Sequence, residues 1–154
     1  MSQDKIKITT LGSLGWMPNQ TSHTCCYCLE YNNILIIFDA GTGMSRFSED
    51  FGEVVLKKYK KIILLLSHYH MDHICGLTYL TRFFQGKSLH IAGPGKHVYE
   101  RTCLEILSEL VTPPYFGRPI QDFPIDLHFH DLGRGNTTIA GLDIECILQE
   151  HSDP

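Results

Sequence analysis

The residues most able to do chemistry in this chain lie in one short stretch, SHYHMDH, from Ser67 to His73. Three histidines and one aspartate fall within six residues, directly after the apolar run IILLLS. His68 and His70 are two residues apart, so both imidazoles can point the same way and share one metal ion. Asp72 and His73 can turn toward a neighbouring point, and imidazole with carboxylate suits transition metals such as zinc or iron. Solvated histidines in a polar turn are the alternative, but clustering them at the end of a buried strand gains little from packing.

The elements that must position this stretch are a strand before it and a helix after it. Lys61 to Ser67 is apolar almost throughout, which predicts a strand covered on both faces, with the histidines at its C-terminal mouth. Apolar residues at helical spacing predict a helix from Ile74 to Phe84. Further strands are predicted at residues 5–12, 24–31, 34–38, 88–93 and 125–132 and in two parts over 137–151, and further helices at 44–59, with a break at Phe51-Gly52, and at 96–111.

This order of elements indicates the α/β (α+β) class, with a mixed β-sheet and helices on one face. The other face of such a sheet needs a cover, and the sequence shows no second set of strands that could supply it. At 154 residues and 43% apolar content, the chain suits a single domain over residues 1–154, without a repeat, a low-complexity tract or a linker.

Charge and composition argue against several classes of function. The formal net charge of −4 gives no basic field for a long nucleic-acid backbone, although a small anionic substrate held by a metal remains compatible. The N-terminus has no apolar signal segment, and no run approaches the roughly 18 apolar residues of a membrane span, so we expect a cytoplasmic protein. The six cysteines show no paired C-x2-C motif, and we expect all of them to be buried, with Cys26 and Cys28 on one face of their strand.

The pattern H-x-H-x-D-H at the end of a strand resembles the signature of the metallo-β-lactamase-fold hydrolases. TLGSLGWMPN, IIFDAGTG, LLLSHYHMDHICGL and IAGPG extend the resemblance over most of the chain. It implies half of an αββα sandwich and a site for two zinc ions, with manganese or iron as options. His68, His70 and His151 match ligands of the first ion, and Asp72 and His73 match ligands of the second.

The resemblance also implies a mechanism, which is hydrolysis by a metal-bound hydroxide. Asp72 would orient the water and accept its proton. Asp39 resembles the aspartate that fixes the orientation of ligand groups from behind the site. Gly41 and Gly43 suit a close approach of the backbone to it.

The chain departs from the family pattern at its end. The family completes the second metal with an aspartate and a histidine from a second half, whereas this chain stops at Pro154, three residues after His151. We therefore expect the N-terminal part of a hydrolase, truncated after the third ligand motif, or a half that forms a homo-oligomer through its exposed sheet face.

The motifs TLGSLGWMPN, TSHTCCYCLEY, DAGTG and PPYFGRPI resemble the branch of the family that contains ribonuclease Z and the cyclic-nucleotide phosphodiesterases. DAGTG departs from the D-C-G-E-G typical of the ribonuclease, and with the acidic charge this favours a small-molecule or nucleotide-type phosphodiester over transfer-RNA processing. His23, Tyr115 and Arg118 are candidate substrate contacts, Arg118 by pairing with a phosphate. Solvated loop positions are the alternative for all three, and His128 and His130 are expected on an exposed strand face.

Two other functions remain open from the sequence. A non-catalytic metal-binding or interaction protein would explain the missing ligands of the second metal. A hydrolase of another ester or a thioester would use the same ligands.

Overall fold

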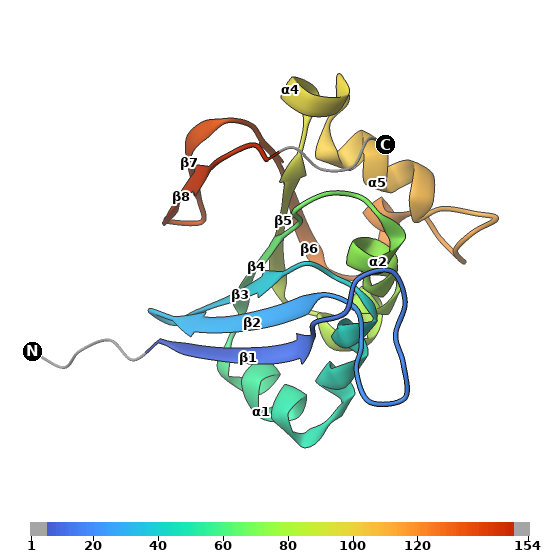
Figure 1. Cartoon of the computed structure of the whole chain (residues 1–154), viewed down its shortest axis with the longest axis vertical. Coiled ribbons are helices and arrows are strands. Elements are labelled where there is room, and N and C mark those ends of the chain that lie inside the picture. The colour runs from blue at the N-terminus through green and yellow to red at the C-terminus, as the bar shows by residue number, and fades with distance from the viewer. Residues whose placement is uncertain (1–5, 150–154) are drawn as a thin grey trace, which may run out of the picture.

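The computed structural model describes residues 6–149, which form a mixed six-stranded sheet in the order β1-β2-β3-β4-β5-β6 (Figure 1). The first three strands pair antiparallel, and β3 to β6 run parallel. The strands are β1 (Lys7–Gly12), β2 (Cys26–Tyr31), β3 (Ile34–Phe38), β4 (Lys61–Leu65), β5 (Ser88–Pro94) and β6 (Asp126–Leu132). Each lies where the sequence predicts a strand, within two residues at its start or end.

Strand β4 is the centre of the fold because both of its faces are covered. Ile62 and Leu64 belong to the main core between sheet and helices, whereas Ile63 belongs to a small core on the opposite face. All three side chains are fully buried. The near-continuous apolar run that predicted a doubly covered strand is confirmed.

The helices pack on one face of the sheet, around Phe47 and Phe84, whose rings lie edge to face with centroids 5.6 Å apart. The 3-10 helices are η1 (Thr42–Ser48), η2 (Cys75–Tyr79) and η3 (Ile120–Asp122), and the α-helices are α1 (Asp50–Lys58), α2 (Met71–Ile74), α3 (Leu80–Phe83), α4 (Lys96–Tyr99) and α5 (Cys103–Leu110).

Three helix predictions are wrong in detail. The helix predicted from Ile74 to Phe84 begins at Met71 and is divided into α2, η2 and α3. Gly52 does not break the helix but lies inside α1, where a Cβ would come within 2.1 Å of the Phe47 carbonyl oxygen, so glycine permits the turn to pack there. The helix predicted over 96–111 is two helices, because Glu100 adopts a left-handed conformation with φ 56°. Thr102 and Glu105 then form a capping box that starts α5 anew.

The second face of the sheet is covered in part by a hairpin. β7 (Gly135–Ile139) and β8 (Leu142–Cys146) form a separate antiparallel pair on the opposite side of the sheet from α2 and α5 (Figure 1). Ile139 is buried against Ile63 and Ala92. The expectation that no further strands would cover this face is therefore wrong at β4 and β5.

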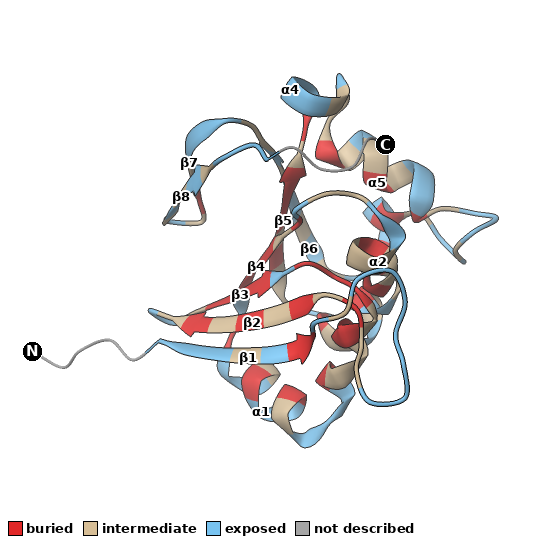
Figure 2. Cartoon of the chain, in the orientation of Figure 1, coloured by how far each residue is buried: buried red, intermediate tan, exposed pale blue. Residues whose placement is uncertain are grey.

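Elsewhere the second face stays open, as the exposed stretches of β1 show (Figure 2). Ile8 and Phe38 are 67% and 39% exposed, on neighbouring rows of the same sheet face. No helix among residues 6–149 is long and apolar enough to cross a membrane.

All six cysteines are free thiols. Cys26 and Cys28 are buried on the helix-covered face, as predicted, and burial raises the pKa of the Cys28 thiol to about 12. Cys25, Cys75 and Cys146 are only partly buried, so the expectation of six buried cysteines holds for three of them.

Candidate metal centre

The histidine stretch and Asp39 meet because β3 and β4 are parallel neighbours that end at the same edge of the sheet. Asp39 directly follows β3, and its backbone N–H donates to the Leu65 carbonyl at 2.9 Å. The chain leaves β4 through Leu66 and Ser67 and enters α2, which carries Asp72 and His73. Asp39 thus faces Ser67 and His73, which lie 28 and 34 positions later in the sequence.

The Asp39 carboxylate connects the end of β3 to the histidine stretch through several hydrogen bonds. Its carboxylate accepts hydrogen bonds from the Ser67 backbone N–H at 2.8 Å and from the Ser67 hydroxyl at 2.9 and 3.0 Å. It also lies 2.8 Å from Nδ1 of His73, so this nitrogen carries a proton toward the carboxylate. The other ring nitrogen, Nε2, is then the one that can bind a metal ion. The backbone of Asp39 has φ 57°, a conformation that aspartate tolerates better than most residues.

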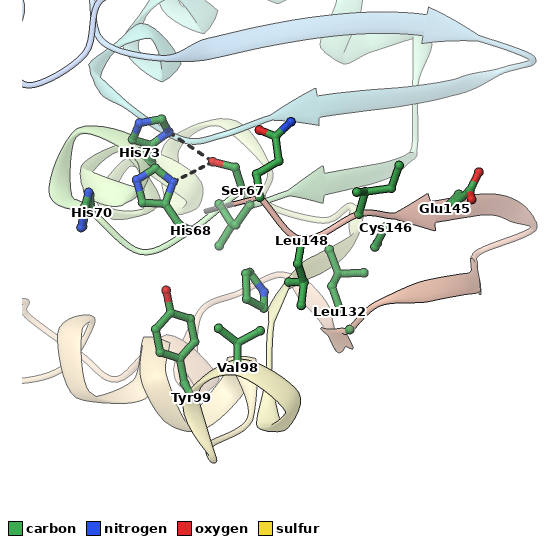
Figure 3. Close-up of a pocket in the computed structure, with 15 residues that line it drawn as sticks. Ser67, His68, His70, His73, Val98, Tyr99, Leu132, Glu145, Cys146 and Leu148 are labelled. Atoms are coloured by element: carbon green, nitrogen blue, oxygen red, sulfur yellow. Dashed lines mark hydrogen bonds between the residues drawn. The ribbon is translucent and has the colours of Figure 1, made fainter. Parts of the chain in front are cut away.

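The imidazole of His68 is in contact with those of His70 and His73. The ring centroids of His68 and His70 are 4.5 Å apart, and those of His68 and His73 are 4.1 Å apart. The Ser67 hydroxyl bridges two of them, at 3.0 Å from Nδ1 of His68 and 3.4 Å from Nδ1 of His73 (Figure 3). The spacing of the histidines gives no signal for this role of Ser67, although Ser67 opens the motif.

Asp72 lies beside Nε2 of His73, with its Oδ2 at 3.4 Å from that nitrogen. The same oxygen accepts the backbone N–H of Trp16 at 2.7 Å. Burial raises the pKa of Asp72, but the Trp16 N–H and the nearby His73 and His68 outweigh it, so the net pKa is below its ordinary value. Asp72 is therefore ionised at neutral pH, as a metal ligand or a proton acceptor must be.

Close backbone packing holds the two loops together. A Cβ on Gly41 would lie 2.2 Å from the Asp72 carbonyl oxygen, and one on Gly76 would lie 2.5 Å from the Gly41 carbonyl oxygen. The N–H of Ala40 donates to the His73 carbonyl at 2.7 Å. Glycine at position 41 thus allows the contact that the sequence analysis expected there.

The histidines open into a cavity of about 660 Å³ between the loop after β4, the α4 region and the chain that follows β8. Apolar side chains form the wall opposite the histidines (Figure 3). They include Val98, Tyr99, Leu132 and Leu148, with Glu145 and Cys146 farther along the rim. The sequence did not predict this apolar wall. Its one sequence signal is that α4, which carries Val98 and Tyr99, follows the motif IAGPG at the end of β5.

The predicted substrate contacts lie outside the lining of this cavity. His23 is part-buried with Nδ1 3.3 Å from the Thr42 hydroxyl. Tyr115 is 80% exposed, and Arg118 is also exposed on the proline loop. The structure does not bring these three side chains together with the histidines, and their roles stay predictions.

The donor set fits a divalent metal in its chemistry, with three imidazoles, an ionised carboxylate and a carboxylate that orients one ring. Within residues 6–149, no group of three or more His, Cys, Asp or Glu is arranged to hold an ion. His151 lies outside the described residues. The individual ligand assignments therefore remain predictions.

Comparison with known proteins gives three findings. The model of the metallo-beta-lactamase superfamily matches residues 20–141. Ribonuclease Z of Thermococcus kodakarensis is 28% identical over 153 residues, which cover 97% of this chain and 44% of that protein. Among solved structures, the metallo-beta-lactamase fold protein YhfI from Bacillus subtilis is similar with a TM-score of 0.65 at 20% identity, over 98% of this chain and 55% of that one. The chain thus spans less than half the length of the ribonuclease Z it matches.

Proposed function

The chain belongs to the metallo-beta-lactamase superfamily, and on that premise we propose that its histidine site binds two zinc ions and serves the hydrolysis of a phosphodiester. His68, His70 and His151 would hold the first ion, and Asp72 and His73 the second. Manganese or iron would suit the same donors. When bound, the metal supplies Lewis-acid stabilisation of charge on the phosphoryl group and lowers the pKa of a water molecule.

The observation that carries this proposal is the link from Asp39 through His73 to Asp72. A hydrogen bond of 2.8 Å fixes one nitrogen of His73, and the other faces the Asp72 carboxylate at 3.4 Å. A metal-binding histidine typically donates its other ring N–H to a carboxylate or a carbonyl, and His73 is held in this way by Asp39. In the reaction, Asp72 orients the attacking water and accepts its proton, because its lowered pKa keeps it ionised.

The substrate class rests on two opposing arguments. The relative at 28% identity is a ribonuclease Z, which supports an RNA phosphodiester. The net charge of −4 supports a small phosphodiester, because the chain offers no basic field for a long backbone. The apolar wall with Tyr99 could contact the non-phosphate part of either.

The experiment measures bound metal and hydrolysis on the same preparations. We expect zinc in the wild-type chain and turnover of bis(p-nitrophenyl) phosphate or of a transfer-RNA precursor. Asp72→Asn should keep a metal and lose turnover by about 100-fold or more, as is typical for a general base. His97→Ala, on an exposed histidine of α4, is the matched control.

The outcomes separate the functions. Full activity of metal-loaded Asp72→Asn would refute the role of Asp72. Bound metal without turnover of either substrate, with zinc, manganese and iron each tried, would favour the non-catalytic metal-binding protein for this chain. Turnover of carboxylic esters or thioesters alone would favour a hydrolase of another ester or of a thioester over a phosphodiesterase.

We further propose that the open part of the sheet supports a homo-oligomer. Ile8 and Phe38 leave an apolar surface on a face where the hairpin β7–β8 covers only the region of Ile63 and Ala92. Light scattering should give a mass above 17.5 kDa, and Ile8→Lys should lower it to the monomer value. A wild-type monomer at high concentration would refute this assembly.

A further inference from the structure

A second group of histidines lies on β5 and β6, away from the candidate metal centre. His90 and His128 are direct partners in the parallel register, and His130 is the next residue on the same face of β6. Nδ1 of His90 lies 3.0 Å from Nε2 of His130. The rings of His90 and His128 are stacked, with centroids 4.5 Å apart and 16° between their planes.

The exposed strand face that the sequence predicts for His128 and His130 is found for His128, whereas His130 is part-buried. His90 and His130 are part-buried, and Ala92, the register partner of His130, belongs to the small core beneath the hairpin. Burial lowers the pKa of His90, and the neighbouring His128 and His130 lower it further. The pKa of His130 is lowered by burial and by His128. Both rings are neutral at pH 7, which is the state in which imidazole binds metals.

Asp126 adds an orienting carboxylate to this group. Its Oδ2 lies 3.0 Å from Nε2 of His128, whose side chain is 44% exposed. A carboxylate that holds one ring nitrogen of a histidine leaves the other nitrogen with its lone pair. The group therefore contains three imidazoles on adjacent strands, one of them oriented by an acid and open to solvent.

We propose that His90 and His130 bind a divalent transition-metal ion through Nδ1 of His90 and Nε2 of His130, at a site separate from the candidate metal centre. Two nitrogens on a tetrahedral zinc ion, at bonds of about 2.0–2.1 Å, are about 3.3 Å apart. The observed 3.0 Å is a hydrogen bond, so one of the two facing nitrogens carries a proton. That proton must move to the other nitrogen of the same ring, and a small side-chain movement then admits the ion between the two lone pairs. Two protein donors leave the remaining positions to water. Among residues 6–149 no three or more His, Cys, Asp or Glu are arranged to hold an ion, so the site has two protein donors only.

The site uses no residue of the proposed hydrolase centre, so the two proposals can fail independently. Cu²⁺ is the best first probe because it binds imidazole sites more tightly than the other divalent ions of its row, and Zn²⁺ then serves as competitor. The titration is made on a His68→Ala/His70→Ala background, which removes two donors of the first centre. Wild-type protein titrated in parallel reports the first centre.

We expect the background variant to bind one Cu²⁺ whose electron paramagnetic resonance spectrum shows imidazole nitrogen couplings. Adding His90→Gln or His130→Gln should abolish this binding, while His97→Gln, a control at an exposed histidine of α4, should leave it unchanged. Circular dichroism checks that each variant folds. If a glutamine variant does not fold, the ring ¹⁵N shifts of His90 and His130 in the folded background protein decide, since both must move on Zn²⁺ addition. Binding that survives His90→Gln, or ring shifts that stay still, would overturn the proposal.

Discussion

The substitution Asp39→Asn tests how the corner of the histidine site is organised. In the wild-type protein, the carboxylate accepts the Ser67 N–H at 2.8 Å and faces Nδ1 of His73 at 2.8 Å. Asparagine has one acceptor oxygen and one amide group that donates. If its oxygen stays with Ser67, its NH₂ group faces His73, whose Nδ1 must then accept. The proton of His73 moves to Nε2, and that nitrogen can no longer bind a metal ion without losing it.

The expected magnitude follows from this change of tautomer. Loss of the group that orients a ligand costs roughly 10- to 100-fold in metal affinity, or about 1.4–2.8 kcal/mol. The replaced charge-assisted hydrogen bonds should also lower the free energy of unfolding by about 1–3 kcal/mol. The alternative flip, with the amide nitrogen toward Ser67, places two donors together and leads to a loss of the same order.

The assay is competition between the protein and a chelating dye for Zn²⁺ at pH 7, with unfolding followed by circular dichroism. Asp50→Asn, at an exposed carboxylate in the first turn of α1, is the matched control and should match wild type. The Zn²⁺ affinity and the stability of Ser67→Ala should lie between those of Asp39→Asn and Asp50→Asn, because Ser67→Ala loses only the contacts of the hydroxyl group. An Asp39→Asn protein that is folded and binds Zn²⁺ with wild-type affinity would refute the role given to Asp39.

Three further predictions follow from packing and charge. Gly41→Ala should lower the unfolding free energy by about 1–3 kcal/mol, measured by urea titration, because the new Cβ meets the Asp72 carbonyl oxygen; wild-type stability would contradict this. Ile139→Ala should open the β7–β8 hairpin, with hydrogen exchange faster there and unchanged in β4. Burial raises the pKa of Glu30, but Lys58, Tyr59 and Lys7 lower it more. Its stabilising contribution should be complete above about pH 4.3 and lost as pH falls through the folded pKa. The stability gap between wild type and Glu30→Gln should therefore shrink in acid.

The strands of the six-stranded sheet could be predicted because each strand carries its own signal. Ile34–Phe38 coincides with the predicted strand, and the apolar run from Lys61 gave the doubly covered β4. The fold class is confirmed by the mixed sheet with helices on one face and by the superfamily match. The helix boundaries could not be predicted because they depend on contacts across the chain. Gly52 is kept in α1 by its fit against Phe47, which no local pattern reveals.

The two histidine clusters show what sequence spacing can and cannot reveal. His68, His70 and His73 are close in the chain, so their shared site is visible in the order of residues alone. His90 and His130 are 40 residues apart and meet only through the parallel pairing of β5 and β6. A strand pattern shows that His128 and His130 share a face, but it cannot show which residue the neighbouring strand places opposite them. The register decides this, because a shift of one residue would turn His90 to the other face of the sheet. The hydrogen bond between His90 and His130 is therefore a property of the fold, and any metal bound there would report the β5–β6 register directly.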